Sequence, residues 1–171
     1  MLDQRVVQVW GELDERAVSL ACAELMTLDA TGDEAVRLVL GEARGALSGV
    51  MALVDTIDLM GVPVHVDCLG RVEGAAVAVV AAGSWRAAAP HARFLLCEPD
   101  GSAAGKADQL AAWAARHRCE LDQFVARLAR ATGRHPEHVE ADLAMGRWLG
   151  AQEAMAYGLV DEVWQTGAHR R

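Results

Sequence analysis

Short runs of β-branched and other apolar residues alternate along this chain with longer segments of helical periodicity. Residues 14–30 carry apolar side chains three or four positions apart, which is the spacing of a helix with one buried face. Strands are predicted at residues 5–11, 36–41, 62–70, 92–101 and 159–164. Helices are predicted at residues 14–30, 45–61, 106–133, 135–146 and 150–158, with a further one opening at Gly74. This alternation predicts an α/β domain whose strands pair mostly in parallel.

The segment CLGRVEGAAVAVVAAG, residues 68–83, contains a sharp change of pattern. A strand ends at Gly70, the charged residues Arg71 and Glu73 follow, and an apolar helix opens on Gly74. Turns of this kind often hold a catalytic nucleophile where backbone N–H groups point at a developing oxyanion. Glycine has no side chain that could attack a substrate. The segment therefore predicts a turn with the form of a nucleophile site but without a nucleophile.

Composition and charge narrow the class of protein. A chain of 171 residues and 18.2 kDa can bury the core of one domain, and residues 1–171 contain no linker or repeat. The net charge of −8 argues against a nucleic-acid partner. The longest apolar run near Gly74 covers residues 75–82, far short of the roughly 20 residues that span a bilayer. The N-terminus MLDQRVVQVW lacks a signal-peptide pattern, so we expect a cytoplasmic protein without membrane contact.

The residue types that bind metals do not occur at metal-binding spacings. The four cysteines, Cys22, Cys68, Cys97 and Cys119, form no CxxC pair. Cys22 and Cys68 are expected to be reduced core residues and Cys97 a core thiol. His135 and His138 lie three residues apart on a short predicted helix, without an acidic or cysteine ligand to complete a site. The sequence therefore predicts neither a metal nor another cofactor.

The C-terminal third of the chain carries a family pattern. Residues 132–163, TGRHPEHVEADLAMGRWLGAQEAMAYGLVDEV, resemble the end of the Clp protease proteolytic subunit. The segment PHARFLLCEP at 90–99 resembles the strand of the family's catalytic histidine, and residues 39–57 resemble its oxyanion loop and next helix. The resemblance implies a ClpP/crotonase-like spiral of β-β-α units. It also implies a protruding handle helix, within a handle region of about residues 98–131, through which two rings stack.

The same resemblance implies the position of a catalytic triad. The family's nucleophilic serine falls on Gly74, its general-base histidine on Cys97, and its orienting aspartate on Gly146. A triad works as a unit, because the hydroxyl needs its base and the base needs its orienting group. Replacement of all three residues implies a noncatalytic subunit with a structural function in an oligomeric ring.

The oxyanion loop also departs from the family pattern. The family's Ser-Pro-Gly-Gly is here Glu-Ala-Arg-Gly, residues 42–45, so the resemblance gives Arg44, Gly45 and Ala75 as the oxyanion-loop equivalents. Glu73 is expected to lie near Arg44 if the two loops meet as they do in the family. We predict that Arg44 and Glu73 form an ion pair that plugs the former substrate site.

The resemblance implies partners as well. Clp subunits form rings, so we expect a homo- or hetero-oligomer with ClpP-like subunits. The candidate interface residues are Gly101, Gly105 and Trp113, and Trp113 is expected to be buried against a partner subunit. Family members carry a further segment before the strand that here begins near Arg5, which gates the pore and helps to dock an ATP-driven unfoldase. Its absence from this sequence argues against the usual unfoldase docking.

Two enzyme functions remain as alternatives. One is a divergent serine-type endopeptidase subunit, with Ser48 and Ser84 as serines that lack acid-base partners in the sequence. The other is a crotonase-like acyl-CoA enzyme, because a glycine at position 74 also fits the turn of that family. Acyl-CoA chemistry needs one or two glutamates, and the matching positions hold Ala78 and, nearby, Glu98.

Overall fold

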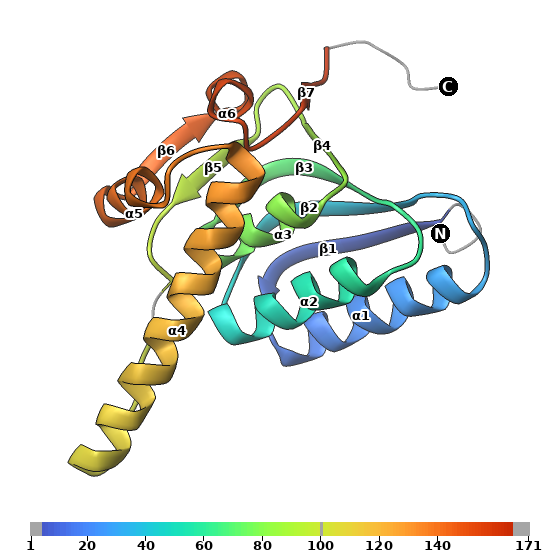
Figure 1. Cartoon of the computed structure of the whole chain (residues 1–171). Helices are drawn as coiled ribbons and strands as arrows, with labels where there is room; N and C mark the ends of the chain where they lie inside the picture. Colours follow the sequence, from blue (N-terminus) through green and yellow to red (C-terminus); the bar gives the residue numbers. More distant parts are fainter. Residues whose placement is uncertain (1–4, 100, 166–171) are drawn as a thin grey trace.

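A computed structural model describes residues 5–99 and 101–165, and in this part of the chain seven strands form one sheet (Figure 1). The strands are β1 (Val6–Leu13), β2 (Val36–Gly45), β3 (Val64–Glu73), β4 (Trp85–Ala88), β5 (Arg93–Leu96), β6 (Arg147–Gly150) and β7 (Glu162–Val163). The helices are α1 (Glu15–Ala30), α2 (Leu47–Leu59), α3 (Val77–Ala82), α4 (Ala107–Thr132), α5 (Pro136–Met145) and α6 (Ala151–Tyr157). A 3-10 turn, η2 (Gly74–Ala76), precedes α3.

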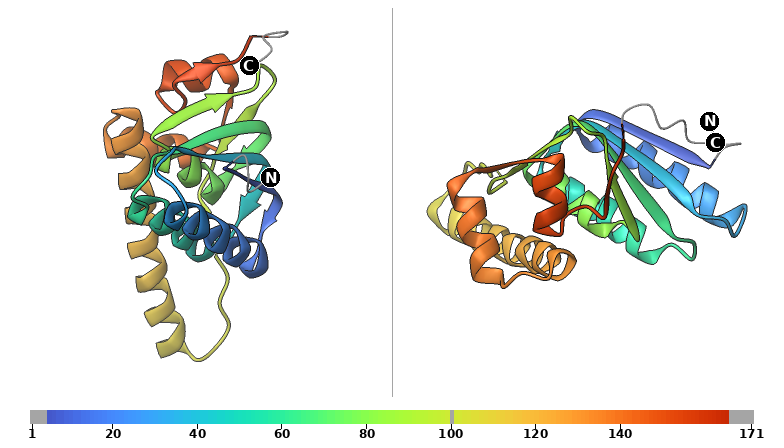
Figure 2. Two further views of the ribbon diagram at one scale, coloured as in Figure 1. Left: turned by 90° about the vertical axis from the view of Figure 1, so that its right-hand side faces the viewer. Right: turned by 90° about the horizontal axis from the view of Figure 1, so that it is seen from above.

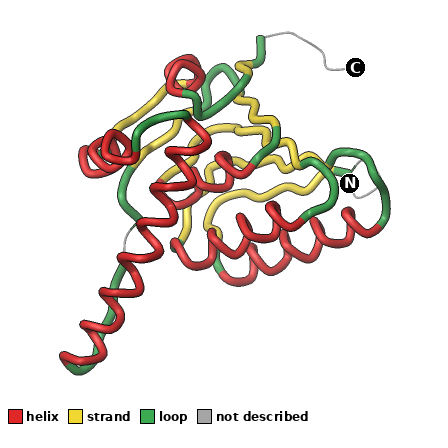
Figure 3. The backbone as a smooth tube through the Cα atoms, in the orientation of Figure 1, coloured by secondary structure: helices red, strands yellow, loops and turns green. Residues whose placement is uncertain are grey.

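The sheet is parallel except at one strand pair, as the alternation of elements predicted. Its main path runs β1-β2-β3-β4-β7, while β5 pairs in parallel with the distal half of β3 and antiparallel with β6. Helices α1, α2 and α3 lie along one face of the sheet (Figure 3). The predicted apolar face of α1 is buried, with Val18, Leu25 and Leu28 in the core. The predicted α/β fold class with mostly parallel strand pairing is therefore confirmed.

Two strands were not predicted, and two were predicted too long. Strand β4 reads Trp-Arg-Ala-Ala and β6 reads Arg-Trp-Leu-Gly, so neither contains a β-branched residue. Both strands form through pairing with distant partners, which a local pattern does not reveal. The strand predicted at residues 92–101 covers only β5, Arg93–Leu96, and the strand predicted at residues 159–164 covers only β7, Glu162–Val163. The buried residues Leu159 and Val160 lie in the connection before β7.

Helix α4 extends beyond the body of the molecule (Figures 1 and 2). Its buried residues, Phe124, Val125, Leu128 and Ala129, all lie in the second half, whereas most of the first half is exposed. The helix ends at Gly133, whose φ of 67° suits a left-handed helix cap. Of the described helices, none has the length and apolar character that a membrane span requires.

The half-buried Trp113 has contacts within its own chain. Its ring stacks on His117 with a centroid separation of 4.9 Å and an interplanar angle of 11°. Gly101 lies so close to both rings that a Cβ atom there would approach them to 2.8–2.9 Å. Gly105, farther along the same loop, lies against Gln109 at the start of α4. The chain's own loop therefore covers part of Trp113, and burial of the remainder against a partner subunit stays a prediction.

A buried carboxylate joins α5, β6 and α6. Asp142 is 8% exposed and accepts hydrogen bonds from Tyr157 Oη at 2.8 Å and from Arg147 Nη1 at 2.9 Å. Burial alone would raise the pKa of Asp142, but these hydrogen bonds and the charges of Arg147 and Arg134 together hold it below its usual value. Burial, followed by the hydrogen bond to Asp142, raises the pKa of Tyr157 to about 12. Because Asp142 and Arg147 lie on either side of Gly146, this network fixes the α5–β6 turn.

Tyr157→Phe should lower the free energy of unfolding by about 1–3 kcal/mol, because one oxygen of the buried Asp142 loses its donor. Urea unfolding measures the difference. The folded state holds the phenolic proton more tightly than the unfolded state. The stabilisation that results from the raised pKa of Tyr157 is therefore fully present below pH 10, the ordinary pKa of tyrosine, and is lost as the pH rises toward 12.

Tyr157 is the only tyrosine of the chain, so tyrosinate absorbance reports on this group alone. We expect its titration midpoint to lie well above the midpoint measured in urea. Equal midpoints, or a Tyr157→Phe variant as stable as the unaltered protein, would contradict the network.

Candidate functional site

Gly74 and Cys97, the first two predicted triad positions, lie within contact distance of one another. Gly74 begins η2 directly after β3, and its φ of 56° is in the left-handed region. A Cβ atom built on Gly74 would lie 3.5 Å from Cys97 Sγ, an ordinary van der Waals contact. Cys97 follows β5, which pairs in parallel with β3 and places Leu95 opposite Glu73. The pairing of β3 with β5 therefore brings position 97 to the turn at position 74.

The third position approaches from β6. Gly146 ends α5 with a φ of 66° and directly precedes β6. Strands β5 and β6 are antiparallel, with Leu96 opposite Arg147, so Cys97 and Gly146 are the next residues along the two strands. The backbones of three residues that are far apart in the sequence thus lie close together, although a Cβ atom at Gly146 would contact nothing within 4 Å. Their side chains supply one thiol there and no hydroxyl, imidazole or carboxylate.

A cleft of about 510 Å³ opens at this place. Gly74 and Cys97 line it, together with the oxyanion-loop equivalents Arg44, Gly45 and Ala75. The remaining lining residues are Glu12, Ala46, Glu73, Glu98 and Pro99. Gly146 does not line the cleft and adjoins it through Cys97. The structure therefore brings the predicted oxyanion-loop residues and two of the three triad positions to one cleft.

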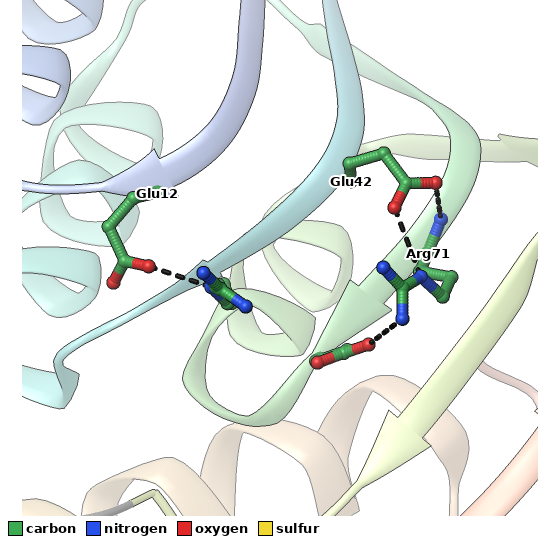
Figure 4. A network of polar contacts seen from close by, with 5 residues as sticks. Glu12, Glu42 and Arg71 are labelled. Atoms are coloured by element: carbon green, nitrogen blue, oxygen red, sulfur yellow. Dashed lines mark hydrogen bonds and ion pairs between the residues drawn. The ribbon is translucent and has the colours of Figure 1, made fainter.

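The predicted plug does not form. Arg44 Nε donates to Glu12 Oε2 at 2.8 Å, while Glu73 lies 3.3 Å from Arg71, and among the described residues Arg44 and Glu73 form no ion pair (Figure 4). Glu12 lies opposite Arg44 across the β1–β2 pair and is therefore the nearer partner. Its hydrogen bond and charge raise the pKa of Arg44, with a smaller contribution from the charge of Glu73. Both predicted plug residues line the cleft, which remains open.

Sequence reasoning missed the carboxylate that anchors this loop. Glu42 has a φ of 49° and accepts hydrogen bonds from Arg71, from the backbone N at 3.1 Å and from Nε at 3.0 Å (Figure 4). Arg71 also contacts Glu73, so one guanidinium joins the loop to the turn before Gly74. Gly70, with a φ of 66°, leaves the room that the Glu42 carboxylate occupies. The sequence pattern does not reveal that Glu42 and Gly70 both adopt a left-handed backbone conformation.

Other candidate residues lie elsewhere. His91, the histidine nearest to Cys97 in the sequence, lines a separate hollow with Trp148 and does not line the cleft around Cys97. Ala78, the position where acyl-CoA chemistry would require a glutamate, is fully buried on α3. His135 and His138 have ring centroids 6.2 Å apart, and no group of three metal-ligating side chains occurs in the described part of the chain.

Gly70→Ala tests how the loop is anchored, with Gly133→Ala as its matched control. The two glycines have nearly the same φ, 66° and 67°, but only position 70 lacks space for a Cβ atom. Both variants should lose about 1–2 kcal/mol of unfolding free energy, because an L-residue is strained in the left-handed region. Gly70→Ala should lose roughly a further 1 kcal/mol, since Glu42 must leave Arg71. Equal losses in urea unfolding would show that the Glu42 anchor contributes nothing.

Comparison with known proteins agrees with this geometry. The family model for Clp protease matches residues 1–167. The chain is 30% identical over 168 residues to the ATP-dependent Clp protease proteolytic subunit 2 of Mycolicibacterium paratuberculosis. That alignment covers 95% of this chain and 83% of the relative. The fold, the turn at Gly74 and the two alignments lead to one conclusion: the chain belongs to the Clp protease family.

Proposed function

We propose that this chain is a noncatalytic Clp protease subunit that acts as a structural component of an oligomeric ring. The observation that carries the proposal is the meeting of Gly74, Cys97 and Gly146, which offers glycine, thiol and glycine where the family has serine, histidine and aspartate. Acyl transfer by a triad requires a hydroxyl nucleophile and a positioned base. Neither group is present at these three positions.

The alternative enzyme functions have less support. Neither Ser48 nor Ser84 lines the cleft, and the Ser84 hydroxyl donates to the carbonyl of Val64 at 2.9 Å. For acyl-CoA chemistry, Glu98 is present in the cleft but Ala78 replaces its partner and is buried in the core. Glu73, also in the cleft, is engaged by Arg71. A divergent serine peptidase and a crotonase-like enzyme are therefore the second and third candidates.

The structural part of the proposal depends on α4. Members of the Clp protease family assemble into rings, and the exposed first half of α4 offers a surface for such assembly. We expect Trp113, on the exposed first half of α4, and Gly101 and Gly105, in the loop before it, to lie at an interface with identical or related subunits in the cytoplasm. Gly101 and Gly105 permit the close packing of the loop on α4 that shapes this surface.

Two measurements on the purified full chain test the proposal together. In sedimentation velocity the protein should run as an oligomer well above the 18.2 kDa of one chain. In parallel, a fluorophosphonate probe, which labels activated serines, should label a catalytic Clp subunit but not this protein. Labelling would contradict the noncatalytic part, and Ser48→Ala and Ser84→Ala variants would then identify the reactive serine. A monomer, alone and with related subunits, would contradict the ring part.

A further inference from the structure

A hollow of about 300 Å³, which we name the β5–β6 hollow, lies where β5 and β6 pair. His91, Arg93 and Trp148 contribute its polar and aromatic side chains. The buried residues Ala92, Leu149 and Ala151 supply apolar lining. Among the described residues, none lines both this hollow and the cleft at Gly74. An inference about the β5–β6 hollow therefore does not depend on the proposed noncatalytic function.

The strand register creates the space of the β5–β6 hollow. Arg93 lies opposite Gly150, and Leu95 lies opposite Trp148. Paired residues of two antiparallel strands project from the same face, so Arg93 and Trp148 are diagonal neighbours on one face of the sheet. Gly150 has no side chain. It therefore leaves a gap opposite Arg93 and beside Trp148, which lies two positions away on the same strand.

The β5–β6 hollow contains basic groups that no carboxylate neutralises. Neither Arg93 nor His91 forms an ion pair within residues 5–99 and 101–165. Glu153 also lines the hollow, but its carboxylate already accepts a hydrogen bond from the backbone N of Gly150 at 2.7 Å. Arg71, opposite Arg93 on β3, is itself paired with carboxylates. The guanidinium of Arg93 is therefore available to an anion.

Trp148 places an aromatic surface beside this guanidinium. The residue is 47% exposed, so its indole is available to a ligand as well. Stacking on an indole favours planar aromatic molecules. A guanidinium favours carboxylate and phosphate groups, to which it donates two parallel hydrogen bonds. The two side chains together suit a molecule that joins a planar ring to an anionic group.

We propose that the β5–β6 hollow binds a small molecule in which a planar aromatic ring carries a phosphate or carboxylate group. The ring stacks on Trp148, the anionic group pairs with Arg93, and His91 supplies a further hydrogen-bonding group. A volume of about 300 Å³ is at the lower end of the range for small-molecule sites, so the ligand is small. A nucleic-acid strand fits less well, because the net charge of −8 repels it.

Fluorine NMR of the full chain, labelled with 5-fluorotryptophan, tests the site directly. The chain has five tryptophans, and the signal of Trp148 is the one that a Trp148→Phe variant loses. Titration with AMP should shift this signal until the site is saturated and leave the other tryptophan signals in place. Adenosine and inorganic phosphate each carry only one half of the proposed chemistry, so each should bind roughly tenfold more weakly than AMP.

Naphthoate, an aromatic carboxylate, is the second ligand in the same titration. Both AMP and naphthoate should shift the Trp148 signal. Tighter binding of AMP would assign the hollow to aromatic phosphates, and tighter binding of naphthoate would assign it to aromatic carboxylates. Either order supports the inference, because both ligands join a ring to an anion.

Two variants separate the contributions of the guanidinium and the ring, with isothermal titration calorimetry as the measurement. Arg93→Gln should weaken AMP binding roughly three- to tenfold, because a solvent-exposed charged pair is lost. Trp148→Leu keeps an apolar side chain but loses the planar surface, and it should weaken AMP binding roughly tenfold.

Arg16→Gln and Trp85→Leu are the matched controls. Arg16 is an exposed arginine of α1, and Trp85 is 43% exposed, close to the value for Trp148. Neither residue lines the β5–β6 hollow, so both variants should bind AMP as tightly as the unaltered protein.

Two results would overturn the inference. One is a Trp148 signal that stays in place with both AMP and naphthoate. The other is AMP binding that Arg93→Gln leaves unchanged. The comparison of AMP with adenosine and phosphate uses the unaltered protein, so the test holds even where a variant fails to fold.

Discussion

Strand β5 pairs with two strands at once, and the site depends on this double pairing. Its parallel pairing with β3 brings Cys97 to the turn at Gly74, and its antiparallel pairing with β6 brings Gly146 beside Cys97. The Asp142–Tyr157–Arg147 network holds the turn from which β6 starts. Backbone hydrogen bonds and buried side chains therefore maintain the geometry of the site, and neither depends on the identity of the three residues that meet there.

This separation explains how a fold can persist when the chemistry of its site changes. The loop that borders the cleft is held by Glu42 and Arg71, and Arg44 in its lining is hydrogen-bonded to Glu12. None of these contacts involves Gly74, Cys97 or Gly146. The cleft remains open, and three carboxylates and one guanidinium group contribute to its lining.

Much of the fold could be predicted from the sequence, because long elements carry their pattern locally. The apolar spacing of α1 and the glycine that ends α4 are examples. Strands β4 and β6 could not be predicted, since they are four residues long, lack β-branched residues and exist only through distant partners. The position of the site followed from the family resemblance, while the partners of its charges did not. Arg44 pairs with Glu12 and not with the predicted Glu73, because the register of β1 on β2 places Glu12 opposite Arg44.

The central claim is that this chain keeps the architecture of a peptidase site without its reacting groups. The most direct measurement is the hydrolysis of a fluorogenic peptide by the triple variant Gly74→Ser, Cys97→His, Gly146→Asp beside the unaltered protein. The account predicts hydrolysis above the buffer blank only for the variant, because the backbone already places the three positions together. A folded triple variant that stays inactive, or an unaltered protein that hydrolyses the peptide equally fast, would contradict it.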